Sequence, residues 1–581
     1  MASTIFYNEV ISIILIEVLF TWNLDDIILF FYPQHNIMFH TKLLIVTLMA
    51  TLLSFSVCGE VIHLTNIKGY SHDGKALKQV NDLLFDSVSG LILEPNKDNM
   101  STVTVLDGKG QFVLPGLHDA HGHILNYGLS RILVDLRGFK SLEATVKHAR
   151  RYAENNPDFP WVLGRGWNQV LWDSNAFPNR YDLDQISTDK PIWLKRVDGH
   201  AGWANSKALE LAGINRETAK DDELILKDSE GIPTGILIDN AMYKMNQHVP
   251  AINRSMKEKA IELAFEDLVA VGLTFVHDAG IGVDSYEIFK QMAADKTMPI
   301  RVYGMLSSSH KKLTSLINSG HLNIENHFIV RSVKLMIDGA LGSYGAIMHA
   351  PYSDDPKQTG AYVQTPEQIE TLLDELVQAD FQANVHAIGD KGNTEVIDLL
   401  SRPQMKSSQL RHRVEHAQIL RLEDIAKFKK HDLIASIQPT HATSDMNMAE
   451  DRVGAERIKG AYAWQKLFNA GVVVASGSDF PVELINPFHG LHAAVTRQNQ
   501  QNQPAGGWYK NEAMSVEQAL QSFTINAAFA AHAEGYSGSL DVGKQADFIV
   551  VDQDIFEIEP ALIWKTEVLE TWVGGQQVFS K

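Results

Sequence analysis

The chain has 581 residues, of which 45% are hydrophobic and 21% are charged, which suits a globular protein with a large buried core. Its formal net charge of −19 at pH 7 argues against nucleic acid or anionic lipid as the main partner. We therefore expect no nucleic-acid partner, whereas the net charge places no limit on a small-molecule ligand.

The N-terminal part of the chain has the pattern of an export signal behind an upstream extension. Residues 1–41 contain no Lys or Arg, whereas Met38 opens the sequence Met-Phe-His-Thr-Lys and an apolar stretch follows. This order is typical of a secretory signal peptide. We predict that residues 1–37 are a spurious extension, that residues 38–59 are the signal peptide, and that the mature protein is secreted or periplasmic without a stable membrane span. The alternative is a membrane anchor, for which the apolar run is short.

The two ends of the mature chain predict one small β-sandwich. Residues 60–113 contain short strand patterns separated by Gly and Asp turns, and residues 536–581 return to turns and strands. We expect these two segments to pack together beside a central domain.

That central domain, residues 114–535, alternates between helix and strand patterns. Helices are predicted to open at the capping sequences that start at Ser255, Thr365 and Ser515. Alternation of this kind implies a parallel sheet, and about eight strands predict a closed (β/α)8, TIM-like barrel. After a first strand that leads into His121, the expected strands are Leu273–His277, Ile300–Met305, Val330–Ile337, Gln382–His386, Arg411–His416, Leu433–Gln438 and Val472–Ser476.

A segment of about residues 130–255 separates the first two predicted barrel strands and is too long for a simple connection. It contains half of the ten tryptophans of the chain. We expect an insert that packs beside the barrel mouth and helps to form a pocket. The alternative is that these tryptophans form the core of the insert itself.

Side chains suited to metal binding follow the predicted strands. His121 and His123 form a His-x-His pair, and alternation along an extended segment points both side chains the same way. Because the C-terminal strand ends of a barrel meet at one mouth, polar residues at those ends are expected to converge. The set fits a divalent metal such as zinc. Four further candidates lie at or near such ends: Lys334, His386, His416 and Asp479.

Several phrases resemble the metal-dependent amidohydrolase superfamily, and in detail amidohydrolase family 3, the branch that includes N-substituted formamide deformylase. The resemblance covers nearly everything from about residue 60 to residue 581. The phrases are Pro115–His123, Gly164–Asn168, Arg196–Ala201, Val333–Ser343, Val385–Asp390, Arg413–His416 and Gly477–Pro481.

The resemblance implies a site for one or two divalent ions, zinc being the expected metal. In that site His121, His123 and Asp479 would bind one ion, His386 and His416 would bind a second, and a carboxylated Lys334 would bridge the two. A plain ammonium could not bridge two ions, because it has three donors and no acceptor. The alternative for Lys334 is an unmodified side chain paired with Asp338 or another carboxylate.

Ligands of these types indicate hydrolysis by a water molecule that the metal activates. The pKa of water falls from 15.7 to about 7 when the water binds a zinc-like ion. Asp479 is the candidate to take the proton of the water and pass it to the leaving nitrogen. The chain has no Gly-x-Ser-x-Gly elbow, and its only cysteine, Cys58, lies in the predicted signal peptide. These absences disfavour a serine or cysteine nucleophile.

Five residues are weaker candidates for contact with substrate, and turn capping or core packing is the alternative for each. They are Trp167, Asp198, His200, Gln438 and His441. The expected function is hydrolysis of non-peptide C–N bonds in small linear amides, such as N-substituted formamides or N-acyl amines. Ester or carbamate hydrolysis at the same site is the alternative, and a non-catalytic binding protein is disfavoured because every expected ligand is present. The sequence is also compatible with a homo-oligomer.

Overall fold

The computed structural model describes residues 61–96, 99–101, 103–405 and 409–581. The expected extension over residues 1–37 and the signal peptide over residues 38–59 lie outside the described residues and stay predictions. Within the described ranges, no helix combines the length and the apolar character needed to span a bilayer.

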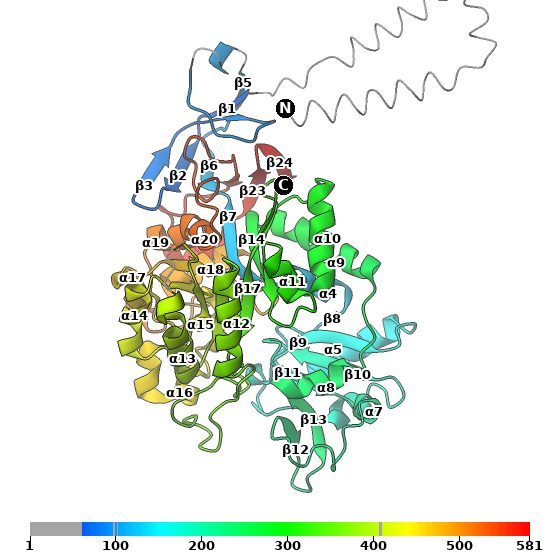
Figure 1. Ribbon diagram of the computed structural model, residues 1–581. Helices are drawn as coiled ribbons and strands as arrows, with labels where there is room; N and C mark the ends of the chain where they lie inside the picture. Colours follow the sequence, from blue (N-terminus) through cyan, green and yellow to red (C-terminus); the bar gives the residue numbers. More distant parts are fainter. Residues whose placement is uncertain (1–60, 97–98, 102, 406–408) are drawn as a thin grey trace, which may run out of the picture. The chain divides into compact units, whose positions relative to one another are not determined.

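The predicted barrel is confirmed. Eight parallel strands follow one another in chain order around the sheet, and the gap between the last and the first is bridged where the Asp479 N–H donates to the His121 carbonyl oxygen at 2.7 Å. Helices surround these strands (Figure 1). The strands are β7 (Leu117–Gly122), β14 (Leu273–Ile281), β15 (Arg301–Ser307), β17 (Phe328–Met336), β18 (Gln382–Ala387), β19 (Arg413–His416), β20 (Ile434–Ile437) and β21 (Val474–Ser476), with β16 (Leu322–Ile324) paired on β17.

Two of the three helices whose starts were predicted from capping patterns begin where the pattern predicts. Two begin directly after Thr365 and Ser515, each with a complete capping box. The prediction for Ser255 is wrong, because Asn253 caps that helix by accepting from the Met256 N–H. The helices are α4 (Ile124–Ile132), α9 (Arg254–Ala270), α10 (Val283–Ala294), α11 (Leu313–Asn318), α12 (Pro366–Gln378), α13 (Asp390–Leu400), α14 (Ile425–Lys430), α15 (Pro439–Asp445), α16 (Ala449–Arg457), α17 (Trp464–Asn469), α18 (Pro487–Thr496), α19 (Val516–Ser522) and α20 (Ile525–Ala530).

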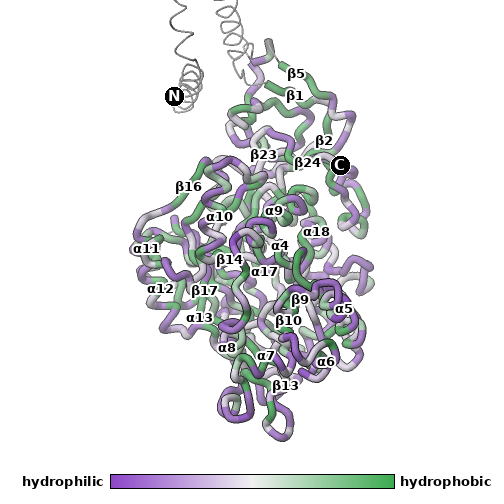
Figure 2. The backbone as a smooth tube through the Cα atoms, turned by 90° about the vertical axis from the view of Figure 1, so that its right-hand side faces the viewer, coloured by the Kyte–Doolittle hydropathy of each residue, from purple (hydrophilic) through white to green (hydrophobic). Residues whose placement is uncertain are grey.

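The main core lies between the barrel strands and these helices. Ile261 and Leu268 of α9, for example, are fully buried in one cluster with Leu117 and Val276 of the barrel. Strands such as β14 are hydrophobic along most of their length, whereas the loops beyond the insert strands are hydrophilic (Figure 2). This burial fixes the strands as a rigid frame for side chains at their ends.

The expected insert forms a sheet of its own, in the order β12-β13-β11-β10-β9-β8. Trp167, Trp172 and Trp203 pack together in its core with Leu194 and Ile236, so most of the tryptophan density builds the insert itself. The elements are β8 (Val134–Asp135), α5 (Leu142–Asn155), β9 (Val162–Trp167), α6 (Arg180–Asp184), β10 (Ile192–Arg196), β11 (Ala201–Ala204), α7 (Ser206–Leu211), β12 (Ile225–Lys227), β13 (Pro233–Ile238) and α8 (Met242–Asn246).

The predicted sandwich is also confirmed. One sheet has the order β4-β1-β5, and the other joins both ends of the chain in the order β24-β23-β22-β6-β2-β3. Phe85, Val113 and Phe548 share its core, and the sandwich and the insert lie at opposite ends of the barrel strands (Figures 1 and 2). The strands are β1 (Val61–Thr65), β2 (Lys68–His72), β3 (Leu77–Val80), β4 (Leu83–Asp86), β5 (Thr104–Asp107), β6 (Phe112–Pro115), β22 (Phe548–Val551), β23 (Val568–Val573) and β24 (Gln576–Ser580).

Candidate metal centre

The ends of the barrel strands bring the predicted metal ligands together. His121, His416 and Asp479 are buried, and each offers a ligand atom within 4.8 Å of the others. The ring centres of His121 and His416 lie 4.8 Å apart, and those of His416 and His386 lie 4.5 Å apart. The tightest group therefore takes members from both of the expected metal sites.

His121 is oriented by a buried ion pair beneath it. Its Nδ1 lies 2.5 Å from Oε2 of Glu415, and Arg413 Nη2 donates to the same oxygen at 3.1 Å. Burial opposes ionisation of Glu415, but Arg413 and His121 hold the pKa of this carboxyl well below its ordinary value. With Nδ1–H donated to a carboxylate, Nε2 is the nitrogen of His121 that faces the cluster.

His416 is held in a similar way. Its Nδ1 lies 2.7 Å from Oε1 of Gln438, which leaves Nε2 as the ligand atom. His416 also has a left-handed backbone, with φ of 71°, as β19 ends there. Gln438 is buried and does not line the cavity at this site. The side chain of Gln438 positions the imidazole of His416, and its contact with substrate stays a prediction.

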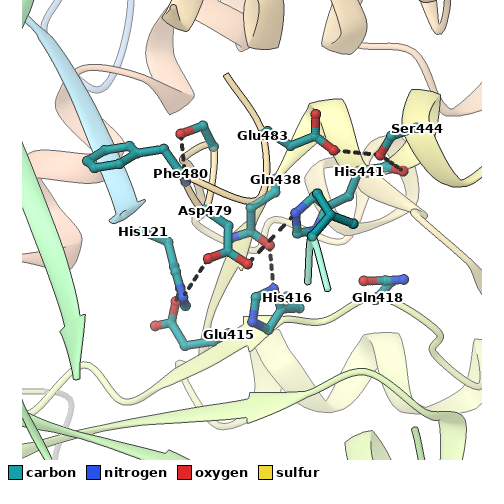
Figure 3. A network of polar contacts seen from close by, with 12 residues as sticks. His121, Glu415, His416, Gln418, Gln438, His441, Ser444, Asp479, Phe480 and Glu483 are labelled. Carbon is teal, nitrogen blue, oxygen red and sulfur yellow. Dashed lines mark hydrogen bonds and ion pairs between the residues drawn. The ribbon is translucent and has the colours of Figure 1, made fainter. Parts of the chain in front are cut away.

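Asp479 follows β21, and Figure 3 shows its carboxylate beside the imidazoles of His121 and His441. Its Oδ1 lies 3.0 Å from His123 Nε2 and 3.9 Å from His121 Nε2, and its Oδ2 lies 3.8 Å from His441 Nε2. Burial opposes ionisation, but the close contact with the His123 ring and the charge effect of His121 keep the pKa of Asp479 well below its ordinary value. Asp479 is thus placed as a carboxylate.

The turn before Asp479 is tied to β7. The Ser478 hydroxyl donates to Asp119 at 2.6 Å, and the His121 N–H donates to the same carboxylate at 3.0 Å. A Cβ on Gly477 would come within 2.5 Å of both Asp119 Oδ1 and the His121 nitrogen. Only glycine therefore lets the two segments approach this closely.

Lys334 points at the same cluster from β17. Its Nζ lies 2.9 Å from His121 Nε2, and none of the described carboxylates lies within ion-pair distance of it. Burial lowers the pKa of Lys334 to about 8. The alternative pairing with Asp338 is not present, because that carboxylate accepts the backbone N–H groups of Ile347, Ile388 and Gly389.

Buried polar atoms without a hydrogen-bond partner test whether these residues suit a metal. His386 Nε2 is buried without a hydrogen-bond partner, and its nearest carboxylate oxygen, on Asp338, is 3.5 Å away. Burial, with the charges of neighbouring groups, lowers the pKa of His386 and of His416 well below 6.5 and that of His121 to about 4. Neutral imidazoles beside a buried carboxylate are ligands of the zinc type, so the residues present fit a divalent ion.

The cluster opens into a cavity of about 1010 Å³ whose wall includes Asp198, His200 and His441. The ring of His441 stacks 5.9 Å from that of His416. His200 Nδ1 lies 2.6 Å from Asp239; burial alone would lower the pKa of His200, but this carboxylate raises it to about 9.

Trp167 does not reach the cavity. It is fully buried in the insert core, and its Nε1–H donates to the Leu194 carbonyl oxygen at 2.8 Å. This position matches the alternative of core packing, and a substrate contact of Trp167 stays an untested prediction.

Sequence reasoning missed Glu415 and Arg413 as supports of the centre. Both are fully buried on β19, and residues two apart on a strand share a face. Buried charges require partners, so an Arg-x-Glu pair inside a core strand was the available signal. Asp239, which orients His200, gave no local signal because its partner lies 39 residues away.

Comparison with known proteins agrees with this geometry. The model of the amidohydrolase family matches residues 104–579. The protein YtcJ of Bacillus subtilis (strain 168) is 31% identical over 482 residues, which cover 81% of this chain and 90% of YtcJ. N-substituted formamide deformylase of Arthrobacter pascens is 26% identical over 493 residues, which cover 81% of this chain and 89% of that protein.

Among solved structures, an uncharacterized metal-dependent hydrolase from Pyrococcus horikoshii OT3 matches with a TM-score of 0.70 at 25% identity. The match covers 86% of this chain and 99% of that chain. Fold and site thus define the class, a metal-dependent hydrolase built on a TIM-like barrel. The chain belongs to the amidohydrolase family, as its sequence motifs predict.

Proposed function

We propose that this protein hydrolyses non-peptide C–N bonds of linear amides, such as N-substituted formamides or N-acyl amines. The observation that carries this proposal is the place of Asp479, a buried carboxylate 3.0 Å from His123 at the inner end of the cavity. An ionised carboxylate there can accept a proton from water and return it to a leaving nitrogen. The similarity to N-substituted formamide deformylase supports an amide as substrate.

In this proposal the residues of the cluster hold one or two divalent ions, zinc being the expected metal. Such an ion, when bound, polarises the substrate carbonyl and makes a water molecule more acidic. The proposed ligands are His121, His123, His386, His416 and Asp479, with Lys334 as a bridge if it is carboxylated.

The side chains of the site then transfer the proton and stabilise the developing charge. Asp479 takes one proton from water, the water oxygen bonds to the carbonyl carbon, and Asp479 gives the proton to nitrogen as the C–N bond breaks. The products are a carboxylic acid and an amine, so atoms and charge balance. His441 and His200 line the cavity as donors for the negative charge that develops on the carbonyl oxygen.

The test is a panel of amides, esters and carbamates with the same substituents, offered to protein reconstituted with zinc or manganese. We expect turnover of the amides. Turnover of esters or carbamates without any amide would overturn the proposal in favour of the alternative hydrolase.

A second arm tests the proton transfer itself. Asp479→Asn is expected to stay folded and to lose about 10²- to 10⁴-fold in kcat, the usual contribution of a general acid–base group. Asp398→Asn, at a surface carboxylate that pairs with Lys427, is the matched control and keeps full turnover. Unchanged kcat in Asp479→Asn would refute the role of Asp479.

A further inference from the structure

Arg165 is a half-buried cation on the wall of the cavity, and no described carboxylate lies within ion-pair distance of it. Two other arginines of the same wall differ. Arg137 is bound by Asp135 at 2.6 Å, and Arg196 is bound by Asp198. The charge of Arg165 is therefore available to a ligand.

The hydrogen bonds of Arg165 are also incomplete. Its Nη2 donates to the Val197 carbonyl oxygen at 2.6 Å, whereas its Nε is buried without a hydrogen-bond partner. A buried donor without an acceptor costs free energy, and structures rarely keep one without a reason. The hydrogen bonds of Arg165 therefore leave donor capacity on a guanidinium that lines the cavity.

The local backbone holds Arg165 in place. It lies on β9 between Gly164 and Gly166, where β9 is pressed against β8. A Cβ on Gly164 would come within 2.3 Å of the Val134 carbonyl oxygen, and one on Gly166 within 2.7 Å of the Arg137 nitrogen. The next residue, Trp167, is anchored in the insert core. A rigid strand therefore presents the guanidinium, which limits the entropy lost on binding.

Arg165 shares the cavity with the metal centre. Burial lowers the pKa of Arg165 to about 10, and the charge of Asp479 opposes this effect, so the guanidinium stays charged at neutral pH. The acids elsewhere in the cavity are engaged with other groups. Asp445 accepts from the Tyr462 hydroxyl at 2.8 Å, and Glu483 accepts from the Ser444 hydroxyl at 2.6 Å.

We propose that Arg165 binds a carboxylate of the substrate, so that the preferred substrates are amides that carry a carboxylate group, such as N-acyl amino acids. This inference rests on the proposed amide hydrolysis for its reaction. A guanidinium offers a planar pair of N–H donors that matches a carboxylate, and such charged hydrogen bonds are about twice as strong as neutral ones.

The experiment compares two amides that differ only in this charge. N-acetylalanine and N-isopropylacetamide are identical except that a methyl group replaces the carboxylate, and the N-formyl pair serves as a second set. The measured quantity is the ratio of kcat/KM for the acid to kcat/KM for the neutral amide. The proteins are the metal-loaded wild type, Arg165→Met, Arg165→Lys and the control Arg150→Met on α5, which lies outside the cavity.

The wild type is expected to favour the acid, and Arg165→Met to reduce the ratio about 10- to 100-fold, the usual effect of losing a charged hydrogen-bond pair. Arg165→Lys should recover part of the ratio, because it keeps the charge but loses the planar pair of donors. Arg150→Met should leave the ratio unchanged. A wild type without preference, or a preference that survives in Arg165→Met, would overturn the inference.

If neither amide is hydrolysed, the proposed function fails, and binding decides the inference by itself. Calorimetry of N-acetylalanine with the metal-loaded wild type and Arg165→Met needs no turnover. Weaker binding of N-acetylalanine to Arg165→Met than to the wild type supports carboxylate binding by Arg165. Equal binding to both proteins refutes it.

Discussion

Glu415 and His121 form a fully buried pair, with Oε2 of the carboxylate 2.5 Å from Nδ1 of the imidazole. The two residues are 294 positions apart in the chain, so only closure of the barrel brings them together. The pair fixes which nitrogen of His121 faces the cluster.

Replacing Glu415 by Gln is expected to weaken metal binding about 10- to 100-fold, because the charge that orients and polarises His121 is lost. The measurement is metal affinity by competition with a chelating dye, with circular dichroism to confirm folding. Glu423→Gln, at an exposed carboxylate beside Arg421, is the control. Equal affinities in Glu415→Gln and the control would show that Glu415 does not support the centre.

Buried His412 predicts a specific loss of stability in acid. Its Nδ1 accepts the Ala383 N–H at 3.0 Å, and burial lowers the pKa of His412 to about 4. Between pH 6.5 and 4 the unfolded chain therefore binds a proton at this residue that the folded chain does not bind. As the pH is lowered through that window, the free energy of unfolding should fall by up to about 1.4 kcal/mol per pH unit because of His412. Above pH 6.5 the contribution of His412 should be constant.

His412→Asn tests this, because the Asn side-chain oxygen can accept the same N–H without titrating. Urea unfolding of both proteins at pH 7.5, 6 and 5, in the same metal-loaded form, gives the two slopes. We expect a shallower slope for the variant. If the free energy of unfolding changes equally with pH in both proteins, His412 does not cause the predicted loss of stability.

Arg301 and Asp547 form a buried pair that ties the barrel to the sandwich. Arg301 Nε lies 2.8 Å from Asp547 Oδ2, and both side chains are at most 2% exposed. Arg301→Met should lower the free energy of unfolding by about 3–5 kcal/mol, because the Asp547 carboxylate would stay buried without its charged partner.

The contrast is Arg254→Met, which removes an exposed pair with Glu258 on α9 and should cost at most about 0.5 kcal/mol. Both values come from urea unfolding. Losses of equal size would mean that the Arg301 pair adds nothing beyond a surface contact.

The barrel and the candidate ligands could be predicted because their signals are local. His386 and His416 lie at or next to the ends of apolar strands, so one local pattern predicts both the strand and the candidate ligand. Thr365 likewise predicts its helix at the capping residue. The presence of an insert could be predicted from the length of the segment between the first two barrel strands.

Other features depend on contacts between distant segments, which a single sequence does not encode locally. Gln438 and His441 lie three residues apart, yet one holds His416 and the other lines the cavity. Trp167 lies in a distinctive motif, but packing against Trp203 decides its place. The same motif contains Arg165. The sequence could not show that Arg165 lacks a carboxylate partner, because that requires the positions of the surrounding carboxylates.

The central claim is that His121, His416, Asp479 and their neighbours hold a divalent metal, and metal content per chain tests it most directly. Elemental analysis should use protein purified without chelators. We predict one or two equivalents; two would agree with a bridge through a carboxylated Lys334, and one with a single ion on part of the cluster. No bound metal, even after reconstitution with zinc or manganese, would contradict the account.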